Sequence, residues 1–308
     1  MSNIRLCFSR LNIIILIETI AEVYMNIILG ATGQVGSMLV DNLLLKSQPV
    51  RAVIRNSSKA QALKDKGAEV SVADYFDAEA LKKAFQGGSS VFLLTPENPE
   101  CTDFINESRR MIKNYREAII SAKISKIIGL SSGGAQHQSG TGNLVASYLL
   151  EHAFSSLEIE QTFIRPSYYF SNWMGYLELV KEHGILPTFF PPEMKVPMIA
   201  PSDVAAFLGE LMSDNAPHER IYEITGPYAY SSSEIAQIFA AVLGRSVTVR
   251  QVPPEAWEST LLQAGFSKDG AHNLMLMTQA VIDGKTTYTT PNPVRSATDF
   301  KTYLKNII

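Results

Sequence analysis

Cysteine is scarce in this sequence of 308 residues: there are two, Cys7 and Cys101, and they form no CxxC pair. A disulfide framework is therefore not expected, and the chain suits a reducing cytoplasm, which is the localisation that we predict. Both thiols are expected to be buried or incidental rather than nucleophilic. The five histidines are scattered without the spacing of metal ligands, so no metal site is predicted.

A strong charge of one sign is also absent, because 27 basic and 30 acidic residues leave a net charge of −3. This balance gives no whole-chain case for nucleic-acid binding, which usually shows as a basic patch. The apolar run 11–17 near the amino terminus is far shorter than the ~20 residues that span a bilayer. Neither nucleic acid nor a membrane is therefore predicted as a partner.

Residues 1–24 are interpreted as an N-terminal extension outside the core fold, such as a mis-assigned start. Arg5 and Arg10 precede the apolar run, as in a signal peptide, but acidic residues follow it and no small-residue cleavage site is present. The fold is expected to begin at Met25, which opens a glycine-rich segment. An amphipathic helix packed on the domain and a secretory signal remain the alternatives.

From residue 26 onward, short apolar runs alternate with segments of helical periodicity. Strands are predicted at 26–29, 50–54, 69–73, 91–94, 126–130 and 161–165, and helices at 35–45, 57–66, 78–85, 103–122 and 142–154. This alternation predicts the α/β class, with a doubly wound parallel Rossmann sheet that is buried on both faces. The NAD(P)-binding Rossmann domain is assigned to residues 25–165.

Proline becomes frequent after Arg165, and residues 166–308 are predicted to form a smaller mixed region that binds substrate and caps the cofactor domain. Residues 186–197 are expected to be irregular because of their prolines. A helix is predicted at 202–213 with Ser202 as its N-cap. Shorter elements are predicted at 220–224, 233–243 and 247–252.

The strongest motif is the segment Gly30-Ala-Thr-Gly33-Gln-Val-Gly36, which follows a predicted strand and opens a predicted helix. Gly30 permits a tight turn, Gly33 lets backbone N–H groups approach a pyrophosphate, and Gly36 lets the helix pack closely on the sheet. The positive end of the helix dipole then faces the phosphates. The predicted phosphate-binding residues are Gly30, Thr32, Gly33, Gln34, Val35 and Gly36.

The end of the second predicted strand indicates which dinucleotide binds. NAD-binding chains usually carry Asp or Glu there, whereas this strand ends in Arg55, with Lys59 four residues later. A guanidinium can hold a 2′-phosphate by charge-assisted hydrogen bonds. We therefore predict that NADP(H) is the preferred cofactor, with NAD(H) as the alternative.

Other candidate cofactor contacts follow the carboxyl ends of later strands, where ligands of parallel sheets bind. Asp74 is placed to accept a hydrogen bond from the adenine amino group. Thr95 and Pro96 are expected to line the cofactor cleft, and Ser131 is expected near the nicotinamide.

Together these segments resemble the NmrA-like branch of the atypical short-chain dehydrogenases/reductases. The resemblance covers most of residues 25–250 and rests on the segments 25–36, 53–56, 73–77, 130–134, 163–172, 203–205 and 222–227. That branch contains NAD(P)H-dependent quinone reductases, azoreductases, phenylpropanoid reductases and redox sensors that bind NADP without turnover. The resemblance therefore implies the cofactor more firmly than it implies the chemistry.

The chain departs from the wider superfamily at its catalytic pair, Tyr-x-x-x-Lys. Asn143 falls at the tyrosine position and Ser147 at the lysine position, and neither can supply a proton from an activated phenol. Glu151 falls where the branch often has a glutamate. Sugar epimerisation and ordinary alcohol dehydrogenation are disfavoured, whereas hydride transfer to a quinone or azo compound needs mainly a positioned acceptor.

His137 and Tyr148 are the candidate catalytic residues, His137 because the unperturbed pKa of histidine, ~6.5, suits proton transfer near neutrality. The plainer alternatives are an exposed loop histidine and a tyrosine that packs its helix. Tyr168, Asn172 and Trp173 are the candidate substrate-binding residues, since aromatic rings can stack a planar acceptor; ordinary core packing is the alternative.

The sequence thus predicts an NAD(P)H-dependent oxidoreductase that transfers a hydride to a small planar aromatic acceptor. The alternative is a non-catalytic protein that senses NADP(H) and binds a protein partner. A homodimer is compatible with either.

Overall fold

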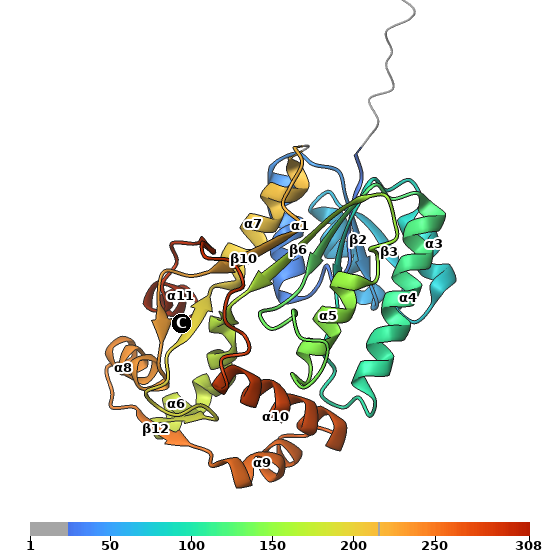
Figure 1. The fold of residues 1–308 in the computed structure, drawn as a ribbon. Helices are drawn as coiled ribbons and strands as arrows, with labels where there is room; N and C mark the ends of the chain where they lie inside the picture. Colours follow the sequence, from blue (N-terminus) through green and yellow to red (C-terminus); the bar gives the residue numbers. More distant parts are fainter. Residues whose placement is uncertain (1–23, 215) are drawn as a thin grey trace, which may run out of the picture.

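The structure is a computed structural model that describes residues 24–214 and 216–308. In this described part, eight strands form a central sheet in the order β13-β10-β6-β5-β4-β1-β2-β3, and every neighbouring pair is parallel (Figure 1). The strands are β1 (Asn26–Ile28), β2 (Val50–Ile54), β3 (Glu69–Val72), β4 (Ser90–Leu94), β5 (Lys126–Leu130), β6 (Glu160–Pro166), β10 (Ile221–Thr225) and β13 (Val294–Arg295).

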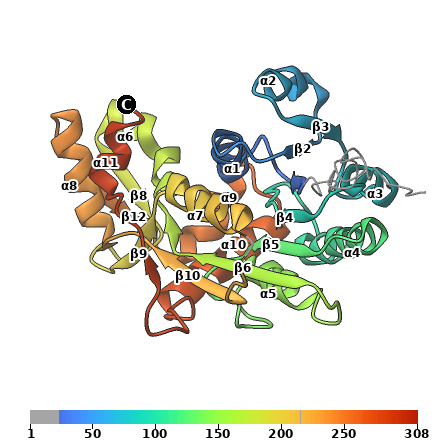
Figure 2. The same cartoon turned by 90° about the horizontal axis from the view of Figure 1, so that it is seen from above.

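Helices cover both faces of this sheet, as the apolar strands require (Figure 2). One face packs against α1 (Gln34–Leu45), α2 (Ala60–Asp65) and α7 (Pro201–Ser213) through a buried hydrophobic cluster. The other face packs against α3 (Ala78–Phe85), α4 (Phe104–Ala122) and α5 (Leu144–His152) through a second cluster. The prediction of a doubly wound α/β fold is confirmed.

The smaller region has its own core, built around the buried rings of Phe170, Phe239 and Phe300. Two small sheets frame it, and the region is mixed, as predicted. One sheet joins β7 (Tyr168–Tyr169), β9 (Val196–Ile199) and β11 (Ala229–Tyr230), and the other joins β8 (Ile185–Thr188) and β12 (Thr248–Gln251). Its helices are α6 (Leu177–His183), α8 (Ser232–Leu243), α9 (Trp257–Gln263), α10 (Lys268–Ile282) and α11 (Phe300–Lys305).

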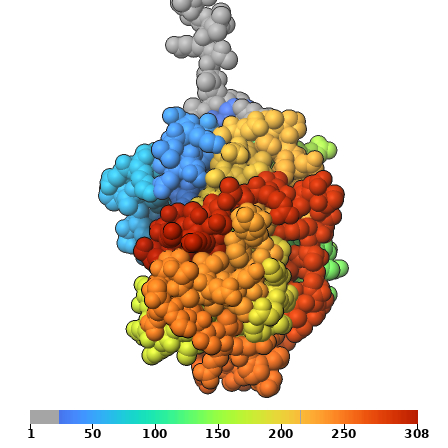
Figure 3. Space-filling view, turned by 90° about the vertical axis from the view of Figure 1, so that its left-hand side faces the viewer, coloured from blue at the N-terminus to red at the C-terminus, as the bar shows by residue number. Residues whose placement is uncertain are grey.

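The two regions interleave along the chain, because segments on both sides of the predicted boundary at residue 165 build the central sheet. Helix α7 packs against α1, and strands β10 and β13 extend the sheet beyond β6. Figure 3 shows the last residues of the chain, in red, as a band between the blue amino-terminal layer and the orange carboxy-terminal elements. The carboxy-terminal residues therefore contact both regions.

Two local predictions were wrong. The segment 186–197 is not irregular throughout, since β8 and β9 occupy its two ends; Pro187 is tolerated because β8 pairs on one side alone, with β12. Ser202 is not an N-cap. The helix begins at Pro201, whose fixed φ and missing N–H suit the first helical position, and Ala200 precedes it without a side-chain cap.

Other predictions concern the termini and surface. Cys101 is buried with a free thiol, whereas Cys7 and nearly all of the predicted extension 1–24 lie outside the described residues. Among the helices of residues 24–214 and 216–308, none combines the length and apolar character that crossing a bilayer requires.

Candidate active site

The glycine motif forms the turn between β1 and α1, beside the point where the strand order reverses between β1 and β4. Gly30 has a φ of +61°, a conformation that favours glycine, and its carbonyl oxygen accepts a hydrogen bond from the Gly33 N–H at 2.8 Å. A Cβ atom at Gly36 would overlap that same carbonyl oxygen. The sequence therefore needs glycine at Gly36 for α1 to start this close to the strand.

The amino end of α1 is open to a ligand. Its N-cap, Gly33, provides no side-chain hydrogen bond, and the first turn contains no acidic residue. Thr32, Gly33 and Gln34 are exposed, while Val35 is buried beneath them. The first N–H groups of a helix have no partner within the helix, and its dipole is positive there, so this turn is suited to an anion.

Arg55 follows β2 and is exposed, and its guanidinium carbon lies 5.4 Å from the centre of the Tyr75 ring. The salt bridges found among the described residues leave both Arg55 and Lys59 without a carboxylate partner. Lys59 ends a short 3-10 turn, Ser57–Lys59, and is also exposed. Tyr75, which the sequence analysis missed, therefore supports a guanidinium whose hydrogen-bonding groups remain available.

The other predicted cofactor contacts lie along the same edge of the sheet. Asp74 is exposed, and its Oδ1 accepts a hydrogen bond from the Phe76 N–H at 2.8 Å, which fixes the carboxylate beside β3. Thr95 and Pro96 follow β4 and are half-buried. Burial raises the pKa of Tyr75, so its phenol stays neutral beside Arg55.

Ser131 follows β5 and begins a chain of buried polar side chains. Its Oγ donates a hydrogen bond of 2.5 Å to Oε1 of Glu151, on α5. The carboxylate of Glu151 also accepts two hydrogen bonds from Arg165, from Nε at 2.8 Å and from Nη2 at 2.7 Å. Because the hydroxyl hydrogen of Ser131 is used in the hydrogen bond to Glu151, the lone pairs of Ser131 Oγ remain available to accept hydrogen bonds.

The chain of polar groups continues to the carboxy-terminal segment. Arg165 Nη1 lies 3.6 Å from Oε1 of Glu223 on β10 and donates to Thr289 Oγ1 at 3.3 Å. The Glu223 carboxylate accepts from the Thr289 N–H, the Thr289 hydroxyl and the Thr290 N–H. Burial alone would raise the pKa of Glu223, but these donors outweigh it and lower the pKa. Neither Glu223 nor Thr289 was identified from the sequence.

Two residues that the sequence analysis aligned with the catalytic pair, Asn143 and Ser147, lie on or next to α5, the helix that carries Glu151. Ser147 is buried, and its Oγ accepts a hydrogen bond from Ser132 Oγ at 2.9 Å. Asn143 is the residue before α5 and is half-buried. Neither side chain offers the acidic phenol or the cation that the usual pair supplies.

His137 and Tyr148 each have a partner that explains their position. His137 Nε2 lies 3.1 Å from the Lys285 carbonyl oxygen, which ties the loop after β5 to the carboxy-terminal segment. The Tyr148 ring stacks on His152, one turn further along α5, with ring centres 4.0 Å apart. Their catalytic roles remain predictions.

The three predicted substrate-binding residues lie in different environments. Trp173 is 2% exposed in the core of the smaller region and donates to Met198 Sδ at 3.3 Å, the core packing that the sequence analysis gave as the alternative, and its role in substrate binding remains a prediction. Tyr168 meets Trp173 and Phe190 edge to face, and burial raises its pKa. Asn172 is exposed. The local sequence could not distinguish aromatic rings of a core from those of a binding site.

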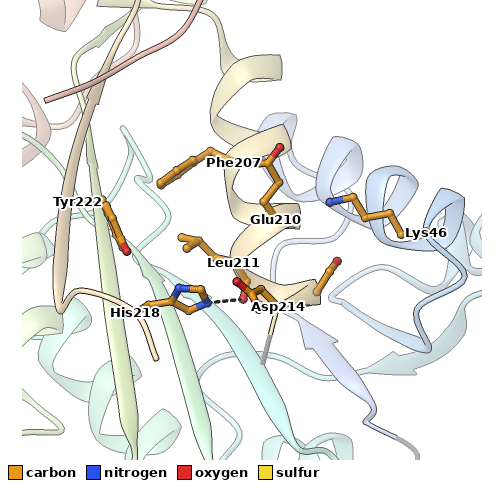
Figure 4. A pocket seen from close by; sticks show the side chains of 8 residues that line it. Lys46, Phe207, Glu210, Leu211, Asp214, His218 and Tyr222 are labelled. Atoms are coloured by element: carbon orange, nitrogen blue, oxygen red, sulfur yellow. Dashed lines mark hydrogen bonds between the residues drawn. The ribbon is translucent and has the colours of Figure 1, made fainter. Parts of the chain in front are cut away.

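A separate pocket of about 500 Å³ lies between the last turns of α7, the residue after α1 and the start of β10 (Figure 4). It is lined by Phe207, Glu210 and Leu211 of α7, by Tyr222, and by Lys46 after α1. His218 closes one side, with Nε2 3.2 Å from the Leu211 carbonyl oxygen. Because α1 starts at the glycine turn and Lys46 is its C-cap, this pocket is a helix length away from the candidate active site.

The family model described as the NmrA-like family matches residues 26–302, nearly the whole chain. The chain belongs to this family. Among the curated relatives of this NmrA-like protein, an NAD(P)H azoreductase from Xenophilus azovorans is 28% identical over 72% of the chain and 75% of its own length. Quinone oxidoreductase 2 from Escherichia coli is 26% identical over 80% of the chain and 84% of its own length.

Solved structures agree on the fold of the NmrA-like chain. The quinone oxidoreductase from Escherichia coli in complex with NADPH is 24% identical, with a TM-score of 0.77 over 92% of this chain and 99% of that one. The Citrobacter triphenylmethane reductase in complex with NADP(H) is also 24% identical, with a TM-score of 0.78 over 92% of this chain and all of that one. The predicted family resemblance is confirmed.

Proposed function

We propose that this NmrA-like protein is an NADPH-dependent reductase of small planar aromatic compounds. The observation that carries the proposal is the pairing of an open helix amino end at α1 with Arg55, an arginine without a carboxylate partner in the described residues, at the end of β2. The first suits a pyrophosphate and the second suits a 2′-phosphate. NAD(H) remains the alternative cofactor.

The residues present fit a dinucleotide. Gly36 cannot carry a Cβ without overlapping the Gly30 carbonyl oxygen, and a Cβ at Gly33 would lie 3.2 Å from the same atom, so the turn keeps its backbone accessible. The pyrophosphate would be held by the glycine turn, with Gly30, Thr32, Gly33, Gln34, Val35 and Gly36. The 2′-phosphate would be held by Arg55 and Lys59. The remaining parts of the cofactor would contact Asp74, Thr95, Pro96 and Ser131. The bound cofactor would supply the hydride.

The chain's own residues then orient the reactants. Ser131 Oγ donates its hydrogen bond to Glu151, so towards a bound cofactor it would act as an acceptor and not as a donor. His137, in the loop after Ser131, and Tyr148, within α5, remain the candidates for proton delivery. A quinone or an azo compound is the acceptor class that we propose, because such electrophiles need little more than a positioned hydride.

Two relatives support this acceptor class, since one is named an azoreductase and the other a quinone oxidoreductase, and they are 28% and 26% identical to this chain over the aligned residues. The second candidate is a sensor of the NADP(H) ratio. The sensor function is favoured because Asn143 and Ser147 stand at the positions aligned with the catalytic tyrosine and lysine. The Ser147 hydroxyl also already accepts a hydrogen bond from Ser132.

A steady-state assay tests the proposal. Purified full-length protein is mixed with NADPH and a panel of quinones and azo dyes, and the absorbance of reduced nicotinamide is followed, with protein-free mixtures as the control. Turnover above the uncatalysed rate for at least one compound is expected. Tight binding of NADPH by calorimetry with no turnover across the panel would favour the sensor instead.

A further inference from the structure

Helix α10 lies beyond the lower end of α5 in Figure 1, next to loops that follow the central strands. Its amino end contacts the segment between β4 and α4. Asp269 Oδ2 accepts a hydrogen bond from the Phe104 N–H at 2.9 Å, and the Ser267 N–H donates to the Pro99 carbonyl oxygen, also at 2.9 Å. The first part of α10 is thus fixed to the loop that follows Thr95 and Pro96.

The middle of α10 contacts the segment that leads into α5. Gly142 has a φ of +56°, and a Cβ atom there would overlap the carbonyl oxygen of Asn273. The backbone of α10 therefore lies directly against the residue before Asn143, the position of the missing catalytic tyrosine. Helix α10 therefore contacts two segments that border the candidate active site. One follows β4, and the other precedes α5.

The side chains of α10 that face these segments are not all packed. Gly270, Asn273 and Thr278 are buried on this side of the helix. Leu274 and Met277 lie on the same side by helical spacing, yet both remain partly exposed. In the described part of the chain, neither belongs to any of the four hydrophobic clusters, although Val281 and Ile282 of the next turn pack against the third.

We propose that Leu274 and Met277 form the apolar wall of the acceptor site and contact the face of a flat aromatic acceptor. This inference rests on the proposed function. An apolar pair on the inner side of a helix that stays partly exposed between buried neighbours suits a ligand that brings its own apolar surface. The thioether of Met277 is flexible and makes favourable contacts with aromatic rings.

Two truncations and a matched control test the proposal. Leu274→Ala and Met277→Ala are compared with Leu276→Ala, which removes the same type of side chain from the side of α10 that carries the exposed His272 and Gln279. Each inner truncation is expected to raise KM for the best acceptor about tenfold, the scale for loss of apolar groups from a binding pocket. The Kd of NADPH should change less than twofold, because the cofactor cradle is untouched.

The conservative variant Met277→Leu separates contact with the acceptor from a general loss of packing. It keeps the volume of the side chain and is expected to restore KM to within threefold of the wild-type value. Equal KM values for Leu274→Ala, Met277→Ala and Leu276→Ala, with folded protein shown by circular dichroism, would overturn the inference. A wild-type protein that binds NADPH but reduces no member of the panel would instead overturn the proposed function on which the inference rests.

Discussion

Arg165 and Glu151 pair through two hydrogen bonds, Nε to Oε1 and Nη2 to Oε2, in the interior between β6 and α5. Their side chains are only 5% and 2% exposed. Glu223 is a second carboxylate beside the same guanidinium, so a single cation serves two buried anions. This arrangement connects Ser131 at the candidate active site with Thr289 near the end of the chain.

Replacement of Arg165 by methionine is expected to destabilise the protein strongly. The variant keeps an apolar side chain of similar length but leaves Glu151 and Glu223 buried without their cation, which lowers the free energy of unfolding by about 3–5 kcal/mol. Urea denaturation measures the difference. The exposed Arg109 provides the control: Arg109→Met should change the free energy of unfolding by less than about 0.5 kcal/mol. Similar losses in both variants would contradict the importance of the buried pair.

Glu223→Gln is expected to make the free energy of unfolding depend less on pH in the acid range. The pKa of Glu223 is lowered from its ordinary value of 4.5 because the Thr289 and Thr290 donors overcome the effect of burial. A carboxyl with a lowered folded-state pKa contributes stability that is fully present above 4.5 and is lost as the pH falls through the lower value. The wild type should therefore lose its advantage over Glu223→Gln below pH 4.5. A difference in Tm that stays constant between pH 7 and pH 3 would contradict this account.

Arg55→Ala is expected to weaken NADPH binding far more than NADH binding. The variant removes charge-assisted hydrogen bonds to a 2′-phosphate that NADH lacks, a loss of roughly 1.5–3 kcal/mol, or about 10- to 100-fold in Kd. Isothermal calorimetry with both cofactors measures it, with Arg109→Ala as the control for a change of net charge. An equal loss of affinity for NADPH and NADH would refute the assignment of Arg55.

Gly36→Ala is expected to remove cofactor binding altogether. The added methyl group would overlap the Gly30 carbonyl oxygen, so α1 would move away from the turn and the N–H groups would lose their common orientation. Gly175→Ala is the matched control, since a Cβ there meets nothing within 4 Å. Calorimetry should detect heat with NADPH for the control alone. Unchanged binding by Gly36→Ala would exclude this turn as the phosphate site.

Local patterns were sufficient to predict the first half of the molecule. Strands β1, β2, β4 and β5 are largely apolar, and the turn at Gly30–Gly36 is specified by glycine positions, so these elements can be identified within a few residues. Cap geometry was less predictable: Asp103 caps α4 at the predicted start, whereas Pro201 replaced Ser202 as the start of α7.

Partners distant in sequence could not be predicted. Glu223 pairs with Arg165 and Thr289 across separations that no motif records, and Tyr75 is recognisable as a support for Arg55 only in three dimensions. The packing of Trp173 in the smaller core could not be predicted for the same reason, because an aromatic ring has the same local sequence signal whether it binds a ligand or packs a core.

The short strand β13 has a consequence for how the protein is made. Strand β13, residues 294–295, is the edge strand beside β10, although β10 ends about seventy residues earlier in the chain. A ribosome adds roughly 5–20 residues per second, so β10 waits several seconds at an uncovered edge before its neighbour exists. During translation, this edge is the place where a nascent chain would first pair wrongly or attract a chaperone.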